Sequence, residues 1–140
     1  MDPTDPNIEG RYRILLTLWA AISMSILIFL GMTRFVPANA VTNAIVSLLL
    51  NCAGIIPLSL SILLKSQLLS KATQARRIEQ VQTAYVVSFA LSEMAALLAV
   101  LDHFINAGAY YYVGFIFAAL GMLLHFPQKK YLLAAAGQEF

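Results

Sequence analysis

The feature that most constrains this chain is a series of four apolar runs that carry almost no charge. Each run reaches or approaches the roughly 20 residues that a helix needs to cross the hydrocarbon core of a bilayer. The runs are Ile14–Thr33, Val41–Leu64, Val81–Ile105 and Tyr110–Phe126. Only 11% of the 140 residues are charged, whereas an average soluble domain has about 25%. The sequence therefore predicts an all-α, multi-pass membrane protein with four transmembrane helices.

Little sequence remains outside these runs, so we expect one integral membrane domain that covers residues 1–140. The short connections favour an up-down bundle, in which consecutive helices run antiparallel. Residues 65–80 form the longest polar connection. We expect the flanking helices to continue into it and to meet in a turn near Ser70–Thr73. The first run is too long for the apolar part of a signal peptide, so we expect it to be retained as a helix.

The basic residues fall on one side of the predicted bundle. Eight of the nine Lys and Arg residues lie before the first run, between the second and third, or after the fourth. The positive-inside rule therefore places these segments and both termini in the cytoplasm. We expect the membrane to be a bacterial cytoplasmic membrane. The basic residues of the 65–80 loop are expected to contact anionic lipid headgroups, with a docking surface for a partner as the alternative. They are Lys65, Lys71, Arg76 and Arg77.

One ionisable side chain, Glu93, lies near the middle of the third run. Ionisable groups at that depth are costly and usually functional. Asn51 lies at a similar depth in the second run: at about 1.5 Å per residue, Asn51 is about 20 Å and Glu93 about 18 Å from the cytoplasmic side. We therefore expect these two side chains to share a hydrogen bond. Burial disfavours the charged carboxylate, so we expect Glu93 to be largely neutral at pH 7 unless a cation or Arg approaches.

Three roles for Glu93 stay open at this point. The first is structural: a protonated Glu93 fixes helix packing through Asn51 or a neighbouring subunit, a kind of contact that contributes about 0.6–2 kcal/mol. The second is binding of a proton or cation during translocation. The third is contact with a substrate or cofactor.

Small residues at four-residue spacing predict close contacts between helices, because the backbones can approach each other there. In the third and fourth runs they are Ala84, Ser88, Ser92, Ala96, Gly114 and Ala118. The second run carries a polar stripe on one helix face, made by Asn43, Ser47 and Asn51. Pro57 lies further along the same run and predicts a kink.

The sequence has no recognisable catalytic or metal-binding pattern. His103 and His125 fall on opposite sides of the predicted membrane, so they cannot share a metal ion or a haem. Asp102 and His103 are adjacent and point about 100° apart on a helix, so we expect them to meet water separately at its outer end. There is no phosphate-binding Gly loop and no CxxC motif. We expect no enzymatic activity, no metal site, no cofactor and no nucleic-acid partner.

A basic loop leads into the stretch Thr83–Leu101, which contains Ala90, Leu91, Glu93 and, in a looser match, Ala95. This stretch resembles the carboxylate-bearing helix of the rotary ATP synthase ring proteolipids. In that family, a hairpin has a polar cytoplasmic loop, and its second helix carries an ion-binding Glu in an A-L-x-E-A-like setting. The resemblance implies that Glu93 is the residue that binds an ion.

The favoured function is that of a small, non-catalytic integral membrane subunit. We expect it to pack with itself or with other membrane subunits, surrounded by membrane lipids. The alternative is translocation of a proton or cation through Glu93. An enzyme or an exporter of small molecules is the third hypothesis.

Overall fold

The computed structural model describes residues 6–38, 42–108 and 110–137, with side chains from residue 8 onward. This part of the chain forms five helices, so the predicted all-α class is confirmed. The helices are α1 (Pro6–Phe35), α2 (Ala44–Gln74), α3 (Ile78–Asn106), α4 (Tyr112–Leu124) and α5 (Lys129–Ala135).

Three of these helices, α1, α2 and α3, are long and apolar enough to cross a membrane. This composition is typical of an integral membrane protein. The fourth predicted span is shorter than expected, because α4 has 13 residues. At about 1.5 Å per residue it is about 20 Å long, less than the hydrocarbon core of about 30 Å. Pro127 follows closely and cannot continue the helix with a backbone hydrogen bond.

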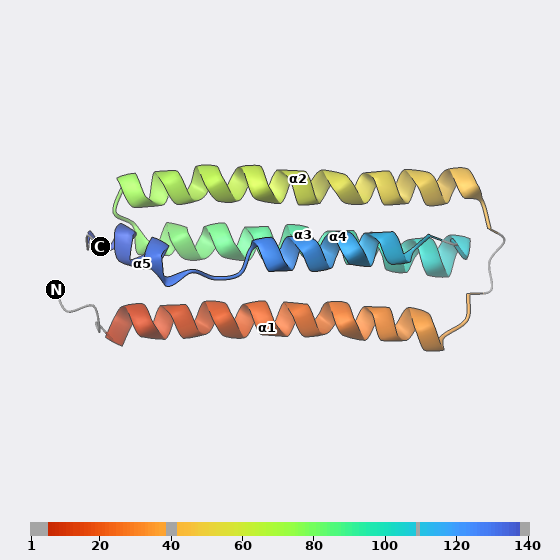
Figure 1. Ribbon diagram of the computed structural model, residues 1–140, viewed down its shortest axis with the longest axis horizontal. Helices are drawn as coiled ribbons and strands as arrows, with labels where there is room; N and C mark the ends of the chain where they lie inside the picture. Colours follow the sequence, from red (N-terminus) through yellow and green to blue (C-terminus); the bar gives the residue numbers. More distant parts are fainter. Residues whose placement is uncertain (1–5, 39–41, 109, 138–140) are drawn as a thin grey trace.

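The helices α1 and α3 extend beyond both ends of the apolar runs that predict them, and α2 extends beyond Leu64, the end of its run. The predicted start of that run, Val41, lies outside the described residues. The polar connection at 65–80 is mostly helical, as expected, but its turn lies at Ala75–Arg77 and not near Ser70–Thr73. The hydroxyl of Thr73 donates to the backbone carbonyls of Leu69 and Ser70, so Thr73 is accommodated inside the helix. The chain reverses only where Arg76 adopts a positive φ of 52°. The helix α2 also continues through Pro57, and Figure 1 shows no marked kink there.

Consecutive long helices alternate in direction, as an up-down bundle requires (Figure 1). Their neighbours are nevertheless not consecutive: within the described residues, α1 packs against α3, α4 and α5 but not against α2. The helix α3 contacts all four others and is the centre of the bundle. The start of α1, the α2–α3 turn and α5 lie together at one end, which we call the basic end.

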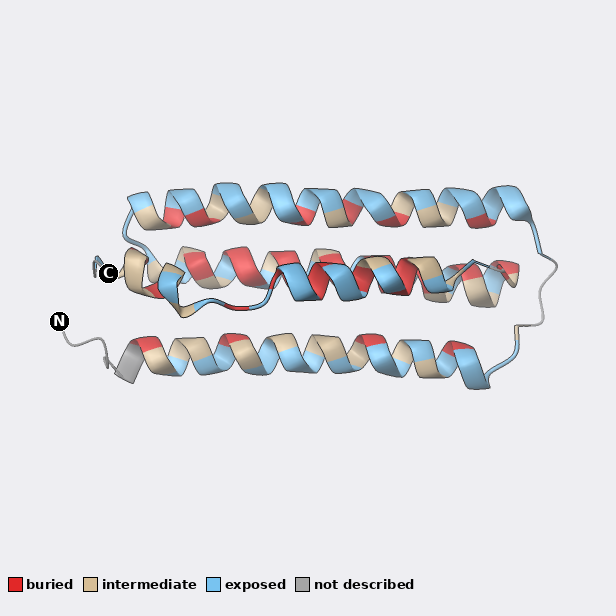
Figure 2. Cartoon of the chain, in the orientation of Figure 1, coloured by how far each residue is buried: buried red, intermediate tan, exposed pale blue. Residues whose placement is uncertain are grey.

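The core lies mainly between α3 and its neighbours, while the outward faces of α1 and α2 are exposed (Figure 2). The six small residues that were predicted to mediate helix contacts are all buried: Ala84, Ser88, Ser92, Ala96, Gly114 and Ala118. A Cβ atom at Gly114 would lie 2.9 Å from the carbonyl oxygen of Ala95. Glycine is therefore what lets α4 approach the backbone of α3 at this point.

Candidate functional site

Glu93 lies on the side of α3 that faces α1. Its Oε1 atom is 2.5 Å from the hydroxyl of Ser25 in α1, and the Glu93 side chain is partly buried. Ser92, the preceding residue, instead faces Gly121 of α4. Successive residues of a helix point about 100° apart, which explains why Glu93 turns away from α4 and towards α1.

The Ser25 hydroxyl has two oxygen neighbours but a single hydrogen. Its Oγ lies 2.8 Å from the carbonyl oxygen of Ile22 as well as 2.5 Å from Glu93. An ionised Glu93 accepts the hydrogen from Ser25. A protonated Glu93 can donate to Ser25 while Ser25 donates to Ile22. The site therefore accommodates both protonation states of the carboxyl group without a change of partner.

The structure does not pair Asn51 with Glu93. In the described part of the chain, Ser25 is the one hydrogen-bond partner of Glu93, whereas Asn51 Nδ2 donates to Ser47 O (2.8 Å) and Asp102 Oδ2 (3.3 Å). The predicted mid-membrane bond between Asn51 and Glu93 is therefore wrong. Glu93 and Asn51 belong to two different polar groups, one around Glu93 and one around Asp102, which lie at different positions along α3.

The polar stripe at the start of α2 packs against two polar residues of α3. Together they form what we call the Asp102 cluster. Its members are Asn43, Ser47, Asn51, Asp102 and Asn106. Asp102 is 1% exposed, so the expectation that it meets water is also wrong. Its carboxylate accepts hydrogen bonds from Ser47 Oγ at 2.7 Å and from Asn106 Nδ2 at 3.0 Å.

Asn106 joins the Asp102 cluster to the start of α2. Its Oδ1 accepts from the Asn43 backbone N–H at 2.7 Å, and its Nδ2 donates to the Asn43 carbonyl at 3.0 Å. Asn43 in turn caps α2, because its side chain accepts from the N–H groups of Ile45 and Val46. A Cβ at Gly108 would overlap the Asp102 carboxylate, so glycine is required beside the cluster. The cluster therefore satisfies its own polar groups and connects α2 to α3.

The polar stripe of the cluster is visible in the sequence, but the register of α2 against α3 differs from the predicted one. Asn43 pairs with Asn106 and Ser47 with Asp102, so each step along α2 matches an equal backward step along α3. Continuing this register places Asn51 level with Leu98, more than one helical turn from Glu93. The predicted match counts depth from Leu64 and Val81, the cytoplasmic ends of the two apolar runs, whereas both helices continue past these residues to the turn at Ala75–Arg77.

His103 has a separate set of contacts. Its Nε2 lies 2.9 Å from the carbonyl oxygen of Val36, in the connection that follows α1. Its ring centroid is 4.8 Å from that of Tyr111. Asp102 and His103 thus face different partners, which agrees with their predicted divergence on the helix.

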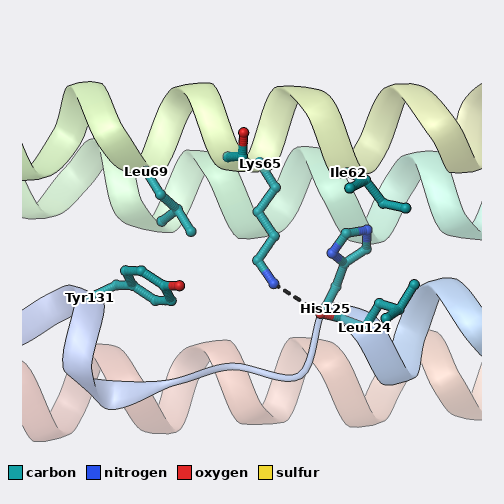
Figure 3. Close-up of a pocket in the computed structure, with 7 residues that line it drawn as sticks. Ile62, Lys65, Leu69, Leu124, His125 and Tyr131 are labelled. Atoms are coloured by element: carbon teal, nitrogen blue, oxygen red, sulfur yellow. Dashed lines mark hydrogen bonds between the residues drawn. The ribbon is translucent and has the colours of Figure 1, made fainter.

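The basic end has a third polar group, around His125. This side chain is 1% exposed, and its Nε2 lies 2.8 Å from Ser61 Oγ. Lys65 is partly buried: its Nζ donates to the carbonyl of Leu124 at 3.1 Å and lies 4.8 Å from the centre of the Tyr85 ring. Figure 3 shows Lys65 directed from α2 towards the α4–α5 connection. The other three basic residues predicted to face lipid are exposed: Lys71, Arg76 and Arg77.

Comparisons of the chain with protein-family models, curated proteins and solved structures gave no match. The resemblance of Thr83–Leu101 to the ring proteolipids stays a prediction. Glu93 lies inside an apolar helix and is partly exposed, whereas Asp102 and His125, the central residues of the other two polar groups, are each 1% exposed.

Proposed function

We propose that the protein is a non-catalytic integral membrane subunit that assembles with itself or with other membrane chains through the face that carries Glu93. The observation that carries this proposal is the partial exposure of a carboxyl group on an apolar helix. The residues one turn away on the same side of α3, Ala90 and Leu97, are both exposed and apolar. A polar group on such a surface is costly when it faces lipid.

A neighbouring helix would remove that cost. Within the described residues, Ser25 satisfies one oxygen of Glu93, and the second oxygen is left for a group from outside this chain. Most described residues belong to the five helices, so the described part of the chain offers little surface outside the bundle. The contact surface therefore belongs to the helices, with Glu93 as its polar centre.

The test is the native mass of the protein after gentle extraction from its own membrane. We expect a mass above that of one chain, and we expect Glu93→Leu to lower it towards a monomer. Glu93→Gln should retain the assembly, because the amide keeps both hydrogen-bonding ability and size. Glu79→Leu is the matched control, since Glu79 is an exposed acidic residue in the first turn of the same helix. A monomeric wild-type protein would contradict the proposal.

Translocation of a proton or cation through Glu93 is the second candidate. The observation that favours it is the pair of contacts at Ser25, which supports both protonation states of Glu93. Purified protein in liposomes would then carry a proton or cation current. Glu93→Gln should abolish the current while the native mass is unchanged, since the amide cannot exchange a proton at the same site. An assembled protein without any such current would exclude this candidate.

A further inference from the structure

A pocket of about 240 Å³ lies at the basic end, between α2 and the α4–α5 connection (Figure 3). Its polar lining comes from Lys65, Ser66, His125 and Tyr131. None of the residues that line it is acidic. A pocket with a cation and hydroxyl groups but no carboxylate is suited to an anion.

Lys65 is the positive charge of this pocket. Its ammonium group has three N–H donors, and the carbonyl of Leu124 takes one of them at 3.1 Å. Figure 3 shows the hydroxyl of Tyr131 directed towards the same space as the Lys65 ammonium group. Lys130 adds a second positive charge nearby, because its Nζ lies 5.0 Å from the centre of the Tyr131 ring.

His125 contributes a buried polar atom without a protein partner. Ser61 Oγ lies 2.6 Å from the carbonyl of Leu58, so the hydroxyl hydrogen is used there and His125 Nε2 acts as the donor to Ser61. In the part of the chain that the structure describes, Nδ1 of His125 has no hydrogen-bond partner. Buried polar atoms are rarely left in this state, so Nδ1 points to a ligand. Neutral histidine accepts there from a hydroxyl, and protonated histidine donates there to an anionic oxygen.

The remaining wall of the pocket is apolar. It is made by Ile62, Leu69 and Leu124. Ile62 is 45% and Leu124 59% exposed, so this wall is continuous with the apolar outer surface of the bundle. The pocket therefore lies where an apolar surface meets a basic end, which is the position of lipid headgroups around a membrane protein.

We propose that this pocket binds the headgroup of an anionic glycerophospholipid. The phosphate pairs with Lys65 and accepts hydrogen bonds from Tyr131 and Ser66. His125 Nδ1 accepts a hydrogen bond from a hydroxyl of the headgroup. The acyl chains leave along Ile62 and Leu124. A free phosphate ion offers the same charge but has no chains to cover this apolar wall.

The experiment counts lipid bound to the full-length protein by native mass spectrometry during titration with phosphatidylglycerol or phosphatidylcholine. We expect phosphatidylglycerol to bind more tightly. Lys65→Gln should weaken its binding about tenfold, the effect of losing one charge-assisted hydrogen bond. Lys71→Gln is the matched control: Lys71 is an exposed lysine of the same helix, and its loss should change binding by less than about twofold.

Two further variants separate loss of binding from loss of folding. Lys65→Arg keeps the positive charge and should keep the preference for phosphatidylglycerol. His125→Gln can retain a donor to Ser61 but lacks Nδ1, and we expect it to weaken binding about fivefold with an unchanged circular dichroism spectrum. Full affinity in both single variants, Lys65→Gln and a folded His125→Gln, would overturn the proposal.

Three other outcomes would also overturn it. Equal losses in Lys65→Gln and Lys71→Gln would show general attraction to the basic end and not a built pocket. Equal binding of phosphatidylcholine would show that the anionic charge is not recognised. Displacement of phosphatidylglycerol by an equal concentration of inorganic phosphate would show that the ligand is a free anion. Resistance of the bound lipid to phosphate supports the lipid headgroup as the source.

Discussion

Ser47 of α2 donates a 2.7 Å hydrogen bond to the carboxylate of Asp102 in α3, and both side chains are buried. This contact joins residues 55 positions apart in the sequence and fixes the register of the two helices. A buried carboxylate is costly unless its oxygens are bonded. The Asp102 cluster meets that requirement with donors from both helices, so we assign it to stability and not to transport.

Replacement of Asp102 by alanine should destabilise the protein strongly. It would leave the Ser47 hydroxyl and one of the two N–H groups of Asn106 Nδ2 without their acceptor, at about 1–3 kcal/mol each. Unfolding in mixed micelles with increasing dodecyl sulfate, followed by circular dichroism, measures the change. Asp102→Asn keeps an acceptor oxygen and should cost less than Asp102→Ala. Equal stability of Asp102→Ala and wild type would contradict the assignment.

Replacement of Gly114 by alanine should separate α3 from α4. The new Cβ would lie 2.9 Å from Ala95 O and 2.9 Å from Ala99 Cβ, and overpacking of this kind costs about 1–3 kcal/mol. Gly31→Ala is the matched control, because a Cβ at Gly31 has no atom within 4 Å. The control should be neutral or slightly stabilising, by up to about 1 kcal/mol, since alanine is the better helix former. The same unfolding assay should rank the two variants in this order.

Two serines of α1 should respond in opposite ways to alanine. Ser25→Ala removes the protein partner of Glu93 and should weaken the α1–α3 contact by about 0.6–2 kcal/mol. Ser23→Ala should be neutral or stabilising, because Ser23 Oγ is buried and has no partner within the described residues. Both variants replace serine by alanine in α1, so the difference between their stabilities reports the contact of Ser25 with Glu93. Equal stabilities would show that this contact contributes nothing.

The orientation of the bundle can be measured with single cysteines in a Cys52→Ala background. Lys71→Cys, near the basic end, should react with a membrane-impermeant maleimide only from the cytoplasmic side. Phe35→Cys lies at the opposite end of α1, is 85% exposed in the wild type, and should react only from the outside. Labelling of intact cells and of inverted vesicles gives the two sides. Reaction of Lys71→Cys in intact cells would reverse the predicted orientation.

The apolar runs predicted the long helices because helix length and composition are local properties that a membrane constrains strongly. The fourth run, Tyr110–Phe126, was a weaker guide, because a turn precedes Tyr112 and the chain leaves the helix at His125. The turn between α2 and α3 was placed too early for a related reason. Polar residues after Leu64 end an apolar run without ending a helix, since their side chains can extend into solvent or bond back to the helix.

Composition and spacing by themselves determined the class of protein, the small-residue face of α3 and the presence of one carboxyl group deep in an apolar helix. Those features depend on residue type and on helical periodicity, which can be read along one chain. Which polar groups meet was decided only by the tertiary structure. Glu93 bonds to Ser25, and Asn51 bonds to Asp102, because partner choice depends on how each helix is rotated and shifted against its neighbours. A shift of one turn moves a contact by about 5.4 Å, which is more than the reach of a hydrogen bond.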